Sequence, residues 1–214
     1  MMRKKPMLAY PVSDKPIDYD KPTFIQPKLD GVRCLIQFEK GFNPSIDPSY
    51  DDRDKIVAYS RTGKEWKNIN HILAELCPFF AKYPNVILDG ELYNHDLKDD
   101  FEKIISLVRK TKPTDEDRVE SAEMVQFHCY DTIMEHMSYD QRNEFINQAL
   151  MLIPSVHIVD TNMLFREDDA KVYHRRNLDQ VTKVLLLELM ILINVNDLII
   201  LESLKILVML KLIS

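Results

Sequence analysis

Short segments rich in β-branched and aromatic residues recur between residues 23 and 131, and in one of them apolar and polar positions alternate. This period of two is typical of half-buried β-strands. The pattern is clearest after Asp30-Gly31, a strong tight-turn signal, because every second residue from Val32 to Phe38 is apolar. The β-branched and aromatic content predicts strands over residues 23–28, 32–38, 56–60, 86–92 and 124–131.

Three other segments carry apolar residues at the spacing of a helix. Residues 68–82 form the first, which Pro84 ends. Residues 99–110 begin with two aspartates and finish with Arg109-Lys110, so their charges suit the helix dipole. Ser138, followed by Gln141 three positions later, indicates a capping box that opens a helix to about Leu150.

Between these elements, residues 41–54 contain two X-Pro turns among scattered charges and are expected to form a loop. No internal repeat and no low-complexity linker precedes residue 180. The mixture of short strands and intervening helices predicts an α+β domain with mainly antiparallel sheets flanked by helices.

Composition narrows the class of protein. The net charge of −6 argues against polyanion binding by the whole surface, so any contact with nucleic acid requires a local basic patch. Cys34, Cys77 and Cys129 lie far apart, which suggests neither a disulfide framework nor a zinc site. Residues 1–6 are basic but precede no apolar segment of signal-peptide length, so we expect an intracellular protein that is not secreted.

The first candidate for chemistry is Lys28, in the segment Gln26-Pro27-Lys28-Leu29-Asp30-Gly31-Val32-Arg33. A neutral lysine amine attacks carbonyl or phosphoryl centres when neighbouring cations or desolvation lower its pKa. Lys28 would lie at a strand end, on rigid backbone. An ordinary hairpin with a solvated lysine accounts equally well for this octapeptide alone.

Two further segments place charged residues beside glycine turns at strand ends. Arg61 in Ser-Arg-Thr-Gly follows an apolar strand, so its guanidinium could hold a phosphate or a ribose. Asp89 and Glu91 follow an apolar run and flank a glycine, so either carboxylate could lie near a bound nucleotide. Without further context, an ordinary surface arginine is the better explanation for Arg61. A solvated acid in a hairpin turn explains Glu91 as well as a nucleotide contact does.

These segments, together with Phe127-His128-Cys129-Tyr130-Asp131, resemble in order and spacing the motifs of the ATP-dependent DNA ligase family. The resemblance spans residues 1–180 and implies an ATP-grasp-like nucleotidyltransferase (adenylation) domain. Lys28 would attack the α-phosphate of ATP, release pyrophosphate and carry AMP as a phosphoramidate. AMP would then pass to the 5′-phosphate of a nick in double-stranded DNA, a reaction of DNA repair, replication and recombination.

The resemblance also assigns the nucleotide site. Glu91 would contact the ribose hydroxyls and the metal environment, and an aromatic residue would stack on adenine. Tyr130 is the first choice for that aromatic and Phe127 the second; because they lie three apart on a strand, they should face opposite sides. Mg²⁺ is expected from the charge that builds on departing pyrophosphate. The residues carried over as nucleotide-binding are Gln26, Lys28, Asp30, Arg33, Arg61, Glu91 and Tyr130.

Related and unrelated alternatives remain open at this stage. RNA ligases and mRNA-capping guanylyltransferases share the core lysine motif. A noncatalytic remnant that binds nucleotide or nucleic acid would also keep these residues. If the chain is a ligase, we expect it to be a monomer, to bind nicked double-stranded DNA and not to associate with a membrane.

Residues 181–214 depart from the family pattern. Val, Leu, Ile and Met dominate them, they contain no glycine, and neither the expected Glu-Gly-x-x-x-Arg strand nor a lysine-rich strand occurs. Charged and amide residues interrupt every window of membrane-spanning length, which argues against a transmembrane helix. We therefore expect an incomplete adenylation domain over residues 1–180 and an aberrant tail over 181–214.

The genetic code offers an origin for this tail. Codons for Gly-Tyr-Glu-Gly-Ile-Ile-Ile-Arg-Ile-Asn-Asp, read without their first base, can give the sequence Val181 to Ile191. The same shift lets Ser203-Leu204-Lys205 come from Lys-Phe-Lys. Both missing elements can thus be recovered from one lost nucleotide, which makes a frameshift the working hypothesis for the tail.

Overall fold

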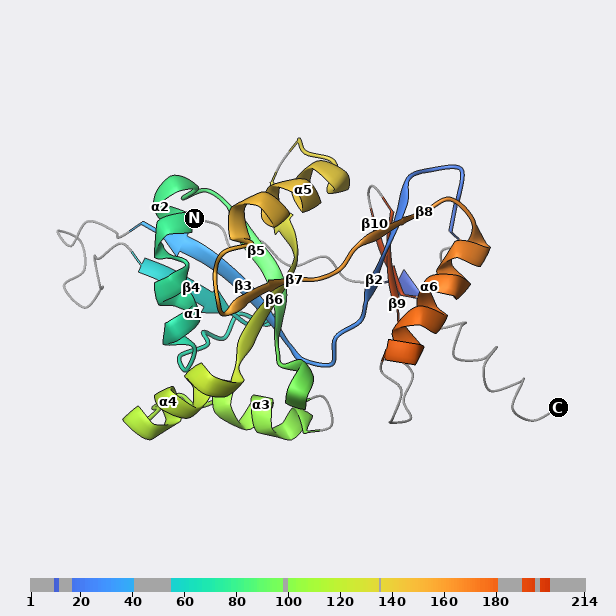
Figure 1. Ribbon diagram of the computed structural model, residues 1–214. Coiled ribbons are helices and arrows are strands. Elements are labelled where there is room, and N and C mark those ends of the chain that lie inside the picture. Colours follow the sequence, from blue (N-terminus) through green and yellow to red (C-terminus); the bar gives the residue numbers. More distant parts are fainter. Residues whose placement is uncertain are drawn as a thin grey trace. The chain divides into compact units, whose positions relative to one another are not determined.

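The computed structural model describes residues 10–11, 17–40, 55–97, 100–134, 136–180, 190–194 and 197–200 of the 214-residue chain. Contacts divide the chain into two compact units. The first comprises residues 1–6 and 30–158, and the second comprises residues 7–29 and 159–214. Each unit contains a five-stranded sheet among its described residues (Figure 1).

The sheet of the first unit has the strand order β4-β3-β5-β6-β7. Neighbouring strands are antiparallel except for β6 and β7, which are parallel. Four of these strands lie within two residues of the predicted ranges, because β-branched and aromatic residues are concentrated in them. The strands are β3 Val32–Glu39, β4 Lys55–Tyr59, β5 Ile87–Tyr93, β6 Gln126–Ile133 and β7 Val156–Ile158.

Helices of the first unit follow the predicted ranges with one difference. The segment predicted as one helix is divided into α1 Asn70–Glu75 and α2 Cys77–Lys82, with Pro78 in the first turn of α2. Proline lacks the N–H that a continuous helix would need at this position, so a new helix begins here. The predicted helices at residues 99–110 and after Ser138 are α3 Phe101–Val108 and α5 Tyr139–Leu150.

Two short elements complete this unit. Helix α4 Asp115–Met124 lies beside α3 in Figure 1, and the 3₁₀ turn η1 covers His95–Leu97. The apolar periodicity did not predict α4, because the helix is mostly polar and acidic and its buried residue is Ser121. Thr114 and Asp117 cap each other at its start.

The core of the first unit lies between the sheet and its helices. At the centre of β3 both faces are covered, since Leu35 and Gln37 are buried as well as Cys34 and Ile36. All three cysteines are free thiols, and burial raises the pKa of Cys34 and of Cys129 well above the usual value. Other fully buried side chains include Ile69, Ile72, Leu76, Phe80, Leu88, Leu92, Ile104, Leu107, Phe127, Tyr139 and Ile146.

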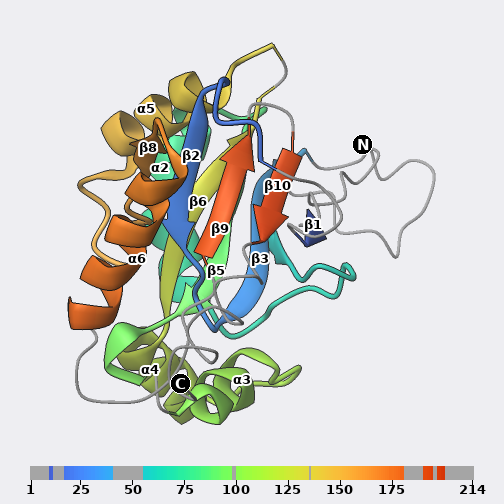
Figure 2. The same cartoon turned by 90° about the vertical axis from the view of Figure 1, so that its right-hand side faces the viewer.

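The sheet of the second unit has the order β1-β10-β9-β2-β8, and Figure 2 shows β2, β9 and β10 side by side. Helix α6 Glu167–Gln180 packs its Ala170 against Ile25 of β2 and Leu164 of β8. Its acidic first turn suits the helix dipole. The strands are β1 Tyr10–Pro11, β2 Thr23–Pro27, β8 Asn162–Leu164, β9 Met190–Asn194 and β10 Asp197–Ile200.

The architecture confirms the predicted α+β class with mainly antiparallel sheets flanked by helices. Strands β9 and β10 lie within the segment predicted as an aberrant tail, and β9 pairs antiparallel with β2. The predicted loop at residues 41–54 lies outside the described residues. Among the described helices, none combines the length and the apolar character that a membrane crossing requires.

Candidate nucleotide-binding site

Three of the predicted site residues lie on neighbouring strands of the first unit. Arg33 of β3 is the register partner of Glu91 on β5, and Tyr130 belongs to the next strand, β6. The Arg33 guanidinium carbon lies 5.0 Å from the centre of the Tyr130 ring. The fold therefore brings Arg33, Glu91 and Tyr130 together from segments far apart in sequence.

Arg33 is held in place by Asp89. Its Nε donates to Oδ1 at 2.7 Å and its Nη2 to Oδ2 at 2.5 Å, which is the two-point geometry of a guanidinium with a carboxylate. Burial opposes the charge on Arg33, but Asp89 and the other acidic groups nearby raise the pKa of Arg33 above its usual value. Burial also raises the pKa of Asp89, and the charge of Arg33 opposes that rise.

The sequence did not single out Asp89 as this partner. Asp89 is only 4% exposed, and it stands two residues before Glu91, on the same side of β5. The only signal for it is a carboxylate within an otherwise apolar run, Val-Ile-Leu-Asp-Gly-Glu. The pairing of β3 with β5 determines whether Asp89 or Glu91 binds Arg33. This pairing cannot be predicted from the spacing of residues along one strand.

A β-bulge sets the direction of Tyr130. Gly90 pairs with Cys129 and Asp89 pairs with Asp131, so Tyr130 is the extra residue of β6. Phe127 is fully buried and covers the opposite side of the strand, where a Cβ on Gly90 would lie 2.6 Å from its ring. Tyr130 is partly exposed beside Arg33, so of the two aromatic candidates only Tyr130 offers its ring outside the core.

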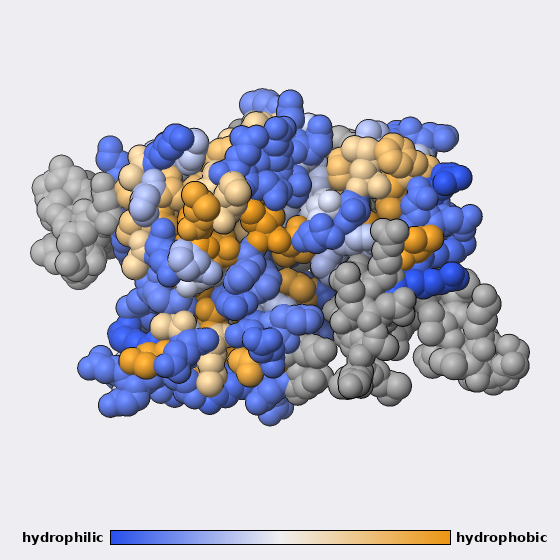
Figure 3. All heavy atoms as spheres, in the orientation of Figure 1, coloured by the Kyte–Doolittle hydropathy of each residue, from blue (hydrophilic) through white to orange (hydrophobic). Residues whose placement is uncertain are grey.

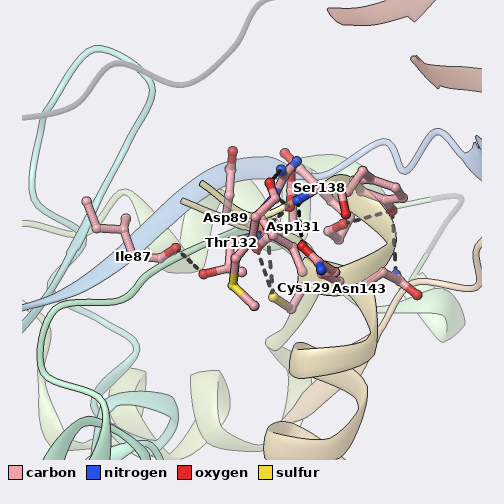
Figure 4. A network of polar contacts seen from close by, with 12 residues as sticks. Ile87, Asp89, Cys129, Asp131, Thr132, Ser138 and Asn143 are labelled. Atoms are coloured by element: carbon pink, nitrogen blue, oxygen red, sulfur yellow. Dashed lines mark hydrogen bonds and ion pairs between the residues drawn. The ribbon is translucent and has the colours of Figure 1, made fainter. Parts of the chain in front are cut away.

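Polar contacts beyond the bulge fix the end of β6 (Figure 4). Asp131 accepts a two-point bond from Arg142 of α5 at 2.8 and 3.0 Å and a bond from the Thr132 backbone at 2.7 Å. Cys129 donates to the backbone oxygens of Asp89 and Asp131. Sequence reasoning missed Asp131 and Arg142, because their partnership joins a strand to a helix.

Gly31 allows β3 to begin close to β5. A Cβ at this position would lie 2.5 Å from Glu91 Cγ and 2.5 Å from the Leu92 carbonyl oxygen, closer than real Cβ contacts permit. The glycine of the Lys-x-Asp-Gly motif is therefore required by the close approach of β5 and not by a positive φ, which Gly31 does not adopt. Asp30, directly before it, is exposed.

Gln26 and Lys28 belong to the second unit. Gln26 is buried on β2, and its Nε2 donates to Thr161 Oγ1 at 2.8 Å. Lys28 follows the last residue of β2 and is half-buried, which agrees with the predicted position at a strand end. It precedes the first unit by one residue, Leu29, along the chain.

Arg61 lies at the exposed turn after β4, where Gly63 has a φ of 89°. The turn is closed by hydrogen bonds from the Gly63 N–H to the Ser60 carbonyl and from the Lys64 N–H to Ser60 Oγ, both 2.9 Å. Arg61 lines a cavity of about 430 Å³ together with Arg33. Trp66, 6% exposed, donates its indole N–H to the Arg33 carbonyl and forms part of the same lining.

Histidines do not assemble a metal site in the described part of the chain, where no group of three or more His, Cys, Asp or Glu is suited to hold a metal. His71 is half-buried, and its Nε2 lies 2.9 Å from the Val125 carbonyl oxygen. His128 stacks on His157 with ring centres 4.9 Å apart. Two described carboxylates belong to the predicted set, half-buried Glu91 and exposed Asp30, and carboxylate oxygens are the ligands that a hard cation such as Mg²⁺ prefers.

A larger cavity, of about 640 Å³, lies between α2 and α5 and includes none of the predicted site residues. Figure 3 shows apolar side chains on the surface in this region. Its aromatic lining consists of Phe79, Tyr83 and Phe145, whose rings contact one another.

Comparison with known proteins decides the family. The sequence profile described as ATP dependent DNA ligase domain matches residues 6–182. The chain belongs to this family. The match covers the four motifs at Lys28, Arg61, Glu91 and Tyr130 and stops close to the point where the sequence departs from the expected pattern. No curated protein matches the chain.

Solved structures with a similar fold include both DNA and RNA ligases. A Lig E DNA ligase, described as binding DNA with a minimal scaffold, has a TM-score of 0.61 at 16% identity over 94% of this chain and 69% of its own. The ATP-dependent DNA ligase of bacteriophage T7 in complex with ATP has a TM-score of 0.56 at 12% identity, over 90% of this chain and 63% of its own.

An archaeal ATP-dependent RNA ligase is also similar, with a TM-score of 0.57 at 13% identity. It is matched over 93% of this chain and 48% of its own length. These identities show a common fold alone. The chain spans 42% of the first of the similar ligase structures, which leaves more than half of that protein without a counterpart here.

Proposed function

We propose that this chain is the adenylation domain of an ATP-dependent DNA ligase and that Lys28 is its nucleophile. The Lys28 Nζ attacks the α-phosphorus of ATP, a P–N bond forms, the bond to the β-phosphate oxygen breaks, and pyrophosphate leaves as the amine loses a proton. In the second step an oxygen of the 5′-phosphate at a DNA nick attacks the same phosphorus, the P–N bond breaks, and the lysine leaves with a proton.

The cluster on β3, β5 and β6 supports the assignment of the nucleotide site. The partly exposed Tyr130 ring would stack on adenine, and Glu91 would accept from the ribose hydroxyls. Arg33, whose orientation Asp89 fixes, would donate to the nucleotide from beside the ring. Gln26, Asp30 and Arg61 complete the proposed set.

Magnesium would enter with the triphosphate, which supplies most of its oxygen ligands. Glu91 is the protein carboxylate proposed to contribute to this environment. When bound, the ion would neutralise charge that builds on the leaving pyrophosphate. The residues of the chain would bind the nucleotide and position Lys28 for attack on the α-phosphorus.

The observation that carries the proposal is the family match over residues 6–182, with Arg33, Glu91 and Tyr130 from three separate motifs on adjoining strands. Fold similarity to an RNA ligase keeps RNA sealing as a second candidate. A capping guanylyltransferase, which would use GTP, and a noncatalytic nucleotide-binding remnant are the remaining alternatives.

Nucleotide labelling separates these candidates. The full chain is incubated with ATP or GTP carrying a radioactive α-phosphate and is then run on a denaturing gel. We expect label from ATP alone, its loss in Lys28→Ala and Lys28→Arg, and its retention in Lys21→Ala, a matched change at an exposed lysine of the same unit. Label that persists in Lys28→Ala contradicts the nucleophile assignment, and label from GTP indicates a capping enzyme. No label in either the 214-residue chain or a chain with the lost nucleotide restored indicates a remnant.

For residues 181–214 we propose that one nucleotide was lost near codon 180, which shifted the reading frame. The end of the family match at residue 182 supports it, as does the codon reading that recovers both missing motifs. On this proposal the intact gene encodes a glutamate and lysines in this region that orient the triphosphate.

A further inference from the structure

Two buried aspartates face each other across β5 and β6. Asp89 and Asp131 are register partners, and Figure 4 shows them side by side. They are only 4% and 7% exposed. Like charges directly opposite one another on neighbouring strands destabilise a sheet, and buried charges are costly unless they are paired. Both carboxylates therefore require a cation close to them.

A different arginine binds each aspartate. Arg33 of β3 binds Asp89 at two points, at 2.7 and 2.5 Å. Arg142 of α5 binds Asp131 at two points, at 2.8 and 3.0 Å. Two guanidinium groups thus serve two carboxylates, so neither arginine has to divide its donors between them.

Arg142 is itself fixed in direction by the start of α5 and the turn before it. Its third guanidinium nitrogen, Nη1, donates to the Met137 carbonyl at 2.9 Å. Its guanidinium carbon lies 5.5 Å from the centre of the fully buried Tyr139 ring, and the side chain is 12% exposed. All three nitrogens are used within the first unit, which suits a residue that positions other side chains and does not itself bind a ligand.

Without Arg142, one guanidinium would have to serve both carboxylates. The Arg33 guanidinium already extends from β3 to β6, because its carbon lies 5.0 Å from the centre of the Tyr130 ring. It is therefore close to the strand that carries Asp131. Because a buried carboxylate without a partner is strongly destabilising, Arg33 would be drawn toward it and away from its two-point contact with Asp89.

We infer that Arg142 is a positioning residue of the nucleotide site. By binding Asp131, it prevents that carboxylate from competing with Asp89 for Arg33. Arg33 then stays beside the Tyr130 ring, from where it would donate to the nucleotide. The inference rests on the proposed function, and Arg142 belongs to none of the four motifs on which the family resemblance depends.

Two changes that break the same ion pair should affect the nucleotide differently. Arg142→Met leaves the Asp131 charge without its partner, so Arg33 should move and affinity for ATP should fall about tenfold, as for the loss of one hydrogen bond to a charged group. Asp131→Asn removes the competing charge together with the ion pair, so affinity should stay close to that of the unaltered chain. Arg142→Lys keeps a cation beside Asp131 and should lose less affinity than Arg142→Met.

A rescue and a control separate positioning from stability. The double change Asp131→Asn with Arg142→Met should restore the affinity that Arg142→Met alone loses, because no unpaired carboxylate remains. Ile146→Ala removes a fully buried side chain one turn further along α5 and leaves both partners of the ion pair in place. It should lower the midpoint of urea unfolding without changing affinity for ATP.

Two measurements provide the readouts. Titration calorimetry with a nonhydrolysable ATP analogue is carried out on the 214-residue chain and on the chain with the lost nucleotide restored. The nitrogen NMR signal of Arg33 Nε, identified by its loss in Arg33→Lys, reports the arginine in the free chain. This signal should shift in Arg142→Met, return toward its original position in the double change and stay in place in Ile146→Ala.

Equal loss of affinity in Arg142→Met and Asp131→Asn would overturn the inference, because it would give Arg142 a structural role only. A loss that the double change does not repair would also overturn it. If Arg142→Met fails to fold, Arg142→Lys and Asp131→Asn provide the same comparison. The expected shifts of the Arg33 signal, with no analogue bound by either chain, would contradict the proposed function alone.

Discussion

Arg33 lies opposite Glu91 in the β3–β5 register, yet its Nε and Nη2 donate to Asp89, two residues away from Glu91. The diagonal contact sets the arginine plane beside the Tyr130 ring. A buried carboxylate thus fixes the direction of a residue that the family motif assigns to the nucleotide.

Asp89→Asn tests this pairing. The change leaves the Arg33 charge partly buried without its counter-ion, which for buried pairs costs about 3–5 kcal/mol of folding free energy. Urea unfolding of the variant measures the loss, and Asp160→Asn, an exposed aspartate, serves as the control. The double change Asp89→Leu with Arg33→Met should cost less than the sum of the two single changes. Additive costs would mean that the ion pair contributes no coupling.

Tyr130→Ala is expected to weaken ATP binding by about 1–3 kcal/mol, the usual range for a base stacked on an aromatic side chain. Tyr130→Phe keeps the ring and should retain most of the affinity. Phe127→Ala should instead lower the free energy of unfolding by about 3–5 kcal/mol, because it removes a fully buried ring. Titration calorimetry and urea unfolding measure the two effects. The reverse outcome would assign the adenine to Phe127.

Asn68 is 1% exposed, and its Nδ2 donates to the carbonyls of Leu107 and Asp117 at 3.1 Å. Asn68→Ala would leave both carbonyls without this donor and should cost about 1–3 kcal/mol in urea unfolding. The exposed Asn147 provides a matched change, Asn147→Ala, expected to stay within about 0.5 kcal/mol. Equal stabilities for the two variants would mean that Asn68 does not join these segments.

His128 makes stability depend on pH. Burial first, then the charges of His157 and His95, lower the pKa of His128 to about 3. An unfolded histidine takes up its proton near pH 6.5, so this contribution is complete above that value and falls as pH drops toward 3. The slope should not exceed about 1.4 kcal/mol per pH unit for one group. His128→Gln should flatten the curve of unfolding free energy in this window, and an unchanged curve would show that other groups cause it.

Restoring one base near codon 180 tests the proposal for the tail. The 214-residue chain should seal nicks poorly, because each preorganised charge that is lost at such a site typically costs about 10²–10³ in rate. The restored chain should seal them well and should aggregate less, since its Leu- and Ile-rich segment disappears. Resequencing the gene and comparing nick sealing by both chains decide the matter. Equal activities, or a restored frame that soon stops, would require the tail to be explained as structure.

The sequence pattern predicted most strands of the first unit, because β-branched and aromatic residues suit strands that are buried on one or both faces. It did not predict the division between α1 and α2, since the apolar spacing continues across Pro78 while the backbone hydrogen bonds do not. It also missed α4 and α6, whose composition is mostly polar and whose starts depend on caps or acidic first turns.

The candidate site divides in the same way. Motifs found Arg33, Glu91 and Tyr130, because the chemistry of a nucleotide restricts the residue types along each segment. The partners Asp89, Asp131 and Arg142 depend on which strand or helix lies beside which. Such neighbours are determined by packing, so no local pattern marks them.

The bulge at Tyr130 restricts how β6 can change during evolution. Phe127 and Cys129 lie before the extra residue and Asp131 lies after it, so the two halves of the strand are out of phase by one position. Deleting Tyr130 would let Cys129 and Asp131 keep their partners Gly90 and Asp89 without a bulge, and Phe127 would stay in the core. Deleting His128 instead would turn Phe127 away from the core and bring Gln126 to its place. Homologous chains should therefore lack single-residue deletions before the bulge, whereas loss of the bulge residue would remove the ring beside Arg33 and leave the rest of the strand in place.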